Sequence, residues 1–75
     1  MVLNSKVKHG IISHTTFDSS FLHKASALGI HPGKKLEVIN RSIFNGPIII
    51  RIDATDIIIR LQDAANIFLK DVTLV

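Results

Sequence analysis

The fold is decided by the stretch Ile48–Leu61, which reads IIIRIDATDIIIRL. Two apolar runs of matching phase, each interrupted by one arginine, flank the polar or small residues 53–56. Successive side chains of a strand point to opposite faces, so the faces that carry Arg51 and Arg60 should be outward. The pattern predicts a β-hairpin with a four-residue tip. Its predicted core residues are Ile48, Ile50, Ile52, Ile57, Ile59 and Leu61.

Three further strands are predicted around this hairpin. Apolar and polar residues alternate along 35–41, which indicates a half-buried strand. Asn45-Gly46-Pro47 separates it from the hairpin, because proline lacks the amide donor that a central strand needs. Residues 8–14 and 67–72 carry β-type patterns too, and the last of these strands would close the sheet.

One short amphipathic helix is predicted before the second strand. Phe21, Ala25 and Leu28 recur at helical spacing and therefore share one face. One of the polar residues 18–20 should cap the start of the helix, because each can accept hydrogen bonds from orphan backbone amides. Gly29 is placed to adopt the left-handed conformation after the last helical residue, so the helix should stop near Leu28.

Two shorter features complete the chain. His31-Pro32-Gly33-Lys34 predicts a turn, with proline preset for the second position and glycine supplying positive φ at the third. Asp63 is expected to cap a single helical turn at 64–66.

The composition indicates a single small all-β domain over residues 1–75. Hydrophobic residues make up 47% of the chain but aromatic residues only 5%, so the core must come mainly from isoleucine, leucine and valine, which favour sheet. There is no cysteine, which excludes a disulfide framework and fits a reducing compartment. About five short strands with one helix and one helical turn predict a small SH3-like β-barrel, in which closure removes exposed edges.

Several classes of function are disfavoured. No strained nucleophile elbow or glycine-rich phosphate loop occurs, so the chain is not expected to be an enzyme or to require a cofactor. The net charge is +3, but the basic residues are spread along the chain, which disfavours nucleic acid as a partner. The apolar runs are too short to span a bilayer, so we expect a soluble, cytoplasmic protein without direct membrane insertion.

Four histidines are weak candidates for a transition metal, because imidazole is the commonest ligand of such metals near neutral pH. They are spread over a strand, a helix and a turn, and no closely spaced pair occurs among them. A closed site within the chain is therefore not expected, and weak or intermolecular binding of iron or zinc stays open. The candidates are His9, His14, His23 and His31.

The outer faces of the predicted strands suggest a protein contact. They carry isoleucines among arginines, and an apolar patch with a basic rim is typical of an interface. The alternative is that the helix or the terminal segments cover these isoleucines. The chain's own self-association also stays open. The candidate partner-binding residues are Lys24, Arg41, Ile49, Arg51, Ile58 and Arg60.

These motifs together resemble the FeoA family, ferrous iron transport protein A. The resemblance spans about three quarters of the chain, and its most specific combination is the LG-hydrophobic-x-PG element followed by the break before Ile48. The chain departs from the family pattern at Gly46, at Ala25 and Ser26, and at its N-terminal entry. The matching stretches are residues 28–33, Leu36-Glu37-Val38, Arg41, residues 45–48, residues 57–60, Ala64 and Ile67.

The resemblance implies an SH3-like fold and a cytoplasmic accessory role in ferrous iron uptake. The implied partner is the FeoB membrane transporter, contacted at its cytoplasmic G-protein-containing region. The family is also classed as binding transition metals, but no family-wide ligand motif matches these histidines. A metal-sensing domain related to the C-terminal SH3-like domain of DtxR-type iron-dependent repressors is the alternative.

Overall fold

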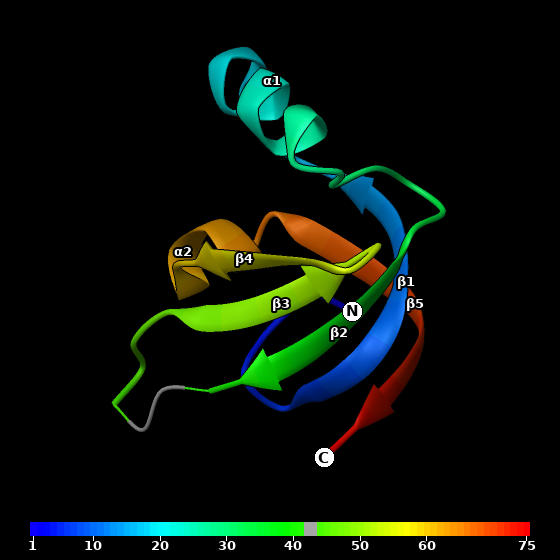
Figure 1. Cartoon of the computed structure of the whole chain (residues 1–75), viewed down its shortest axis with the longest axis vertical. Coiled ribbons are helices and arrows are strands. Elements are labelled where there is room, and N and C mark those ends of the chain that lie inside the picture. The colour runs from blue at the N-terminus through cyan, green and yellow to red at the C-terminus, as the bar shows by residue number, and fades with distance from the viewer. Residues whose placement is uncertain (42–43) are drawn as a thin grey trace.

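The computed structural model describes residues 1–41 and 44–75, and in these it contains five strands and two helices. The strands form one antiparallel sheet in the order β4-β3-β2-β1-β5, with α1 projecting at one end of the molecule (Figure 1). The all-β class, the short helix and the helical turn are thus confirmed. In chain order the elements are β1 (Val7–Thr15), α1 (Ser19–Ala27), β2 (Lys35–Asn40), β3 (Ile48–Ile52), β4 (Thr55–Ile59), α2 (Leu61–Ala64) and β5 (Ile67–Leu74).

The β3–β4 hairpin forms as predicted but has a shorter tip. Ile52 pairs with Thr55, and Asp53 and Ala54 between them have φ angles of 51° and 66°. Two consecutive residues with positive φ make the two-residue turn whose twist matches that of the paired strands. Thr55 and Asp56 therefore belong to β4 and not to the tip. The sequence did not reveal this, because Asp-Ala lacks the glycine that usually marks such a turn.

The helical turn after the hairpin begins earlier than predicted. Its first residue is Leu61, which leaves the strand and packs, partly buried, against the core. The N-cap position is occupied by Arg60, and Asp63 lies in the first turn, where it accepts a hydrogen bond from Arg60 Nε at 3.3 Å. Ala64, fully buried, ends the helix, so the expected turn at 64–66 with Asp63 as its cap is wrong.

Helix α1 begins and ends where the sequence indicates. Asp18 is the N-cap, and its carboxylate accepts a hydrogen bond from the Phe21 amide at 2.9 Å. This bond and one from Ser20 lower the pKa of Asp18, because they favour the charged carboxylate. Gly29, with φ of 95°, follows the helix end. Leu28 was predicted on the buried face but is 48% exposed, because at the C-cap it borders a groove.

The hydrophobic core follows from the alternation of the strands. Every buried position of β3 and β4 is an isoleucine, and full burial of each such side chain stabilises the fold by roughly 1.5–3 kcal/mol. Five of the six predicted hairpin core residues are buried, and Leu61 is the exception. The buried hydrophobic residues are Leu3, Val7, Ile12, Ala25, Ile30, Leu36, Val38, Ile48, Ile50, Ile52, Ile57, Ile59, Ala64, Ile67 and Leu69.

The sheet is curved but not closed, which corrects the expectation that the last strand would complete a barrel. β4 and β5 are the two ends of the strand order. The chain's first residues lie along the outer side of β5: the Leu3 amide donates to the Ile67 carbonyl at 2.9 Å, and the Leu69 amide donates to the Met1 carbonyl. This segment occupies the position that β4 would need for closure.

Candidate functional site

A shallow, mainly apolar groove lies between helix α1 on one side and strand β4 with the start of α2 on the other. Its volume is about 270 Å³. One wall is the face of α1 that carries Phe21, Ala25 and Leu28, and the other is the β4 strand with the residues that follow it. The lining residues are Phe21, Lys24, Ala25, Leu28, Ile30, Ile57, Ile58, Ile59, Arg60 and Asp63.

The rim of this groove carries more positive than negative charge. Lys24, in the last turn of α1, makes no salt bridge in the described part of the chain. Arg60 lies 3.3 Å from Asp63, and its side chain is 67% exposed. Because this guanidinium is largely exposed to water, it can also donate hydrogen bonds to a carboxylate of a partner. The groove thus combines an apolar floor with two available cations.

The outer face of the hairpin carries three of the other predicted contact residues, Ile49, Arg51 and Ile58. Ile58 is 73% exposed and is paired with the partly buried Ile49 on β3. Arg51 donates two hydrogen bonds to Asp56, at 2.7 and 3.1 Å. This pairing raises the pKa of Arg51 and lowers that of Asp56, because each charge stabilises the other.

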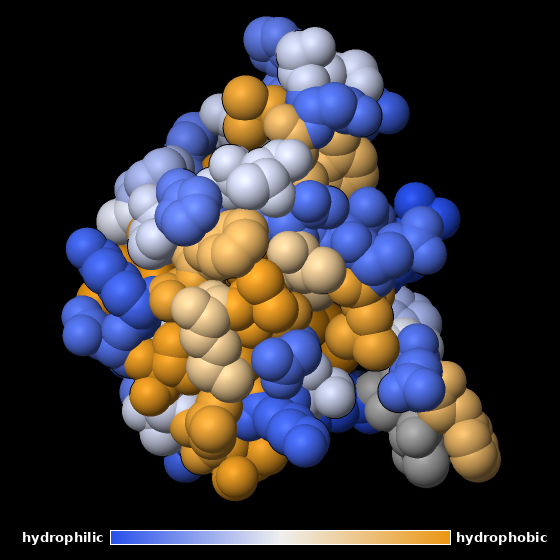
Figure 2. All heavy atoms as spheres, turned by 180° about the vertical axis from the view of Figure 1, so that it is seen from behind, coloured by the Kyte–Doolittle hydropathy of each residue, from blue (hydrophilic) through white to orange (hydrophobic). Residues whose placement is uncertain are grey.

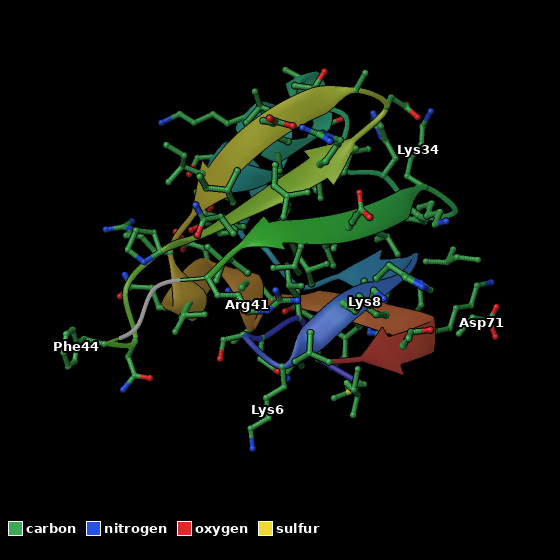
Figure 3. The ribbon with its side chains drawn as sticks, turned by 60° about the horizontal axis from the view of Figure 1, so that its bottom comes forward. Lys6, Lys8, Lys34, Arg41, Phe44 and Asp71 are labelled. Carbon is green, nitrogen blue, oxygen red and sulfur yellow. The ribbon has the colours of Figure 1, made fainter. Side chains whose placement is uncertain are left out.

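Arg41 lies elsewhere. β2 ends at Asn40, and a register shift after Val38 breaks the alternation on which its outward placement depended. The Arg41 guanidinium donates to the Ser5 carbonyl at 2.8 Å and to the Val7 carbonyl at 2.7 Å. Figure 3 shows Arg41 within the fold, beside the chain that enters β1. Its visible role is to hold the N-terminal segment against the sheet.

The structure therefore brings together Lys24, Ile58 and Arg60 at the groove, with Ile49 and Arg51 on the adjoining face. Residues contributed by α1, such as Leu28, were missed as surface candidates because helical spacing assigned them to the core. Phe44 was missed as well: its side chain is 90% exposed and points away from the sheet (Figure 3). On the side of the molecule that is hidden in Figure 1, exposed hydrophobic side chains also gather in the lower half of the view (Figure 2).

The histidines do not converge. His14 stacks on Phe68, with ring centroids 4.4 Å apart, while His9 lies on β1 in register with Glu37. His23 is on α1 and His31 is in the turn before β2. Among residues 1–41 and 44–75, no three side chains of the metal-binding types lie close enough to hold an ion together. Transition-metal binding by the histidines therefore stays a prediction.

Taken together, the five-stranded antiparallel sheet, the short helix and the helical turn define a small SH3-like fold. The sequence model of the FeoA domain matches residues 5–71, and the chain belongs to the FeoA family. This membership supports a role in ferrous iron uptake, within a family of non-enzymatic accessory proteins.

The fold is also similar to a solved structure. The crystal structure of an iron uptake regulatory protein, FeoA, superposes with a TM-score of 0.77 and is 23% identical, covering 93% of this chain and 97% of that one. No curated protein sequence matches the chain. Neither helix of the described residues is long and apolar enough to cross a bilayer.

Proposed function

We propose that this protein is a cytoplasmic accessory component of ferrous iron uptake that acts by binding the G-protein-containing region of a FeoB-like transporter. The observation that carries the proposal is the apolar groove between α1 and β4, with Lys24 and Arg60 on its rim. Family membership supports the role in ferrous iron uptake, and the groove is a surface to which a partner protein can bind.

The groove is suited to a protein segment. Concave surfaces lined by hydrophobic side chains with a few polar groups are the usual binding sites of proteins. Leu28 and Ile58 present exposed apolar surface at its two walls, and covering them would release water from both. The two rim cations would then orient the segment and speed its association. We infer that the partner segment offers an apolar side chain flanked by an acidic residue.

A binding measurement with matched charge reversals tests this assignment. The cytoplasmic region of the cognate FeoB is immobilised, and the affinities of the wild type, Lys24→Glu, Arg60→Glu and Lys70→Glu are compared. Lys70 is an exposed lysine on β5 and does not line the groove, so its reversal controls for net charge. We expect binding by the wild type and by Lys70→Glu, and at least tenfold weaker binding by the two groove variants.

Three results would contradict the proposal. Absence of binding by the wild type rejects FeoB as the partner. Equal weakening by all three reversals shows a non-specific effect of net charge, which rejects the groove. A fourth reversal, Arg51→Glu, is measured alongside these, and if it alone weakens binding the contact lies on the outer face of the hairpin and not at the groove.

A further inference from the structure

The outer edge of β4 has unpaired backbone groups. In the part of the chain that the structure describes, β4 is the last strand of the sheet on its side and pairs only with β3. In Figure 3 it is the uppermost strand, with α1 behind it. Edge strands are usually protected by lysine, proline or a covering element, because their free amides and carbonyls can pair with another chain. β4 contains three consecutive isoleucines and neither lysine nor proline, and a groove separates it from α1.

The hairpin fixes which backbone groups are free. The pair Ile52–Thr55, which flanks the two-residue turn, exchanges hydrogen bonds across the hairpin, and such pairs alternate along an antiparallel ladder. Asp56 and Ile58 therefore direct their amides and carbonyls away from β3. Arg60 is extended and continues this alternation, although its carbonyl already accepts bonds from the amides of α2.

The charged side chains of this edge are arranged so that two antiparallel copies of the segment would complement each other. The sequence Asp56-Ile57-Ile58-Ile59-Arg60 has an acid at one end, a base at the other and isoleucine between them. Asp56, Ile58 and Arg60 are all exposed. When two copies of this segment run antiparallel with Ile58 facing Ile58, each Asp56 lies opposite an Arg60.

We propose that β4 pairs antiparallel with β4 of a second copy of this chain, about a two-fold axis at Ile58. The two Ile58 residues exchange both of their backbone hydrogen bonds, and each Arg60 amide donates to the Asp56 carbonyl of the other copy. The contact is isologous, so one surface serves both copies.

The charges favour this register over its neighbours. Directly opposed side chains of unlike charge stabilise a sheet, and like charges destabilise it. Centring the pair on Asp56 would place two carboxylates in contact. Centring it on Ile57 would place each Asp56 against an isoleucine. Only the register centred on Ile58 extends the Arg51–Asp56 ion pair, by adding Arg60 of the second copy on the other side of the carboxylate.

A single cysteine tests the geometry. The chain has no cysteine, so an Ile58→Cys variant can form only a symmetric disulfide. The α-carbons of a hydrogen-bonded antiparallel pair are about 5.5 Å apart, which lies within the range of α-carbon distances that disulfides bridge. Thr73→Cys, on the exposed part of β5, is the matched control. Under mild oxidation we expect the Ile58→Cys chain to crosslink to a dimer much faster than the control, and equal rates would overturn the proposal.

Charge reversal tests the register. Asp56→Lys and Arg60→Glu each place like charges opposite one another in both halves of the contact. Each variant alone should dimerise at least tenfold more weakly than the wild type. An equimolar mixture should form a heterodimer, because every opposed pair is then of unlike charge. Sedimentation measures the masses, and circular dichroism checks that both variants fold. A mixture that stays monomeric while the wild type dimerises rules out this register.

This inference does not depend on the identity of the transporter. The oligomeric state is measured on the isolated protein, whereas the proposed function is measured as affinity for FeoB. Because Ile58 and Arg60 also line the groove, the two contacts would compete. A dimer without FeoB binding leaves the inference intact, and FeoB binding by a strict monomer leaves the proposed function intact but overturns the dimer.

Discussion

At the scale of single residues, Arg41 shows how a charged side chain can serve the fold. Its guanidinium bridges the carbonyls of Ser5 and Val7, which belong to the segment entering β1. The planar fork of arginine suits two acceptors that are held by the same stretch of backbone. A residue that alternation placed on an outer binding face therefore fastens the N-terminal part of the chain.

Replacing Arg41 with alanine should destabilise the protein by about 2 kcal/mol, because hydrogen bonds from charged donors contribute roughly 1.5–3 kcal/mol each and part of this loss is regained from water. Arg41→Lys should recover only part of the loss, since an ammonium cannot reproduce the fork. Urea unfolding of the three proteins provides the measurement. A change below about 0.5 kcal/mol for the alanine variant would show that the two bonds do not stabilise the fold.

Asp18 allows a prediction about pH. Its pKa is lowered in the folded protein by hydrogen bonds to the carboxylate. A lowered pKa means that the stabilisation is present above the unfolded pKa, near 3.8, and is lost as the pH falls through the folded value. Asp18→Ala should therefore lower the melting temperature at pH 7, and the difference from the wild type should shrink below pH 3.8. Melting curves across this range would contradict the idea if the gap were constant.

At the scale of elements, α1 buries much less of its surface against the rest of the fold than the strands do. Ala25 is its one buried residue, and Phe21 is partly buried against Phe17, with ring centroids 4.7 Å apart. An element with so few buried contacts opens locally at a lower free energy than global unfolding. The amides of α1 should therefore exchange with deuterium well before those of β1 and β3. Equal protection in all three would show that α1 unfolds only with the whole domain.

The elements also show what a sequence can predict. Period-two alternation identified β3 and β4 and their buried isoleucines, because one buried face leaves a regular signature. The cap of α1 followed from a side chain that bonds locally. The two-residue tip, the start of α2 at Leu61 and the position of Arg41 were not predicted. The tip was missed because Asp53-Ala54 lacks the glycine that usually marks such a turn, whereas the start of α2 and the position of Arg41 depend on contacts with distant parts of the chain.

The candidate site could be predicted only in part from the sequence, for the same reason. Lys24, Ile58 and Arg60 were identified as exposed residues, but their meeting at one groove depends on where α1 lies over β4. Helical spacing assigned Leu28 to the core, whereas the short helix leaves it at the groove wall. A surface that combines two elements requires their relative placement, which local patterns do not contain.

At the scale of the whole molecule, the two edges of the sheet differ. Among the described residues no strand pairs with the outer edge of β4, whereas β5 is covered along Ile67–Leu69 by the residues that begin the chain. This asymmetry limits growth. When two copies are joined through β4, the strand at each end of the combined sheet is β5. Each β5 is covered along Ile67–Leu69 by the first residues of its own chain. This covered part of β5 cannot pair with a third copy, so the covered stretch at each end opposes growth of the pair into a filament.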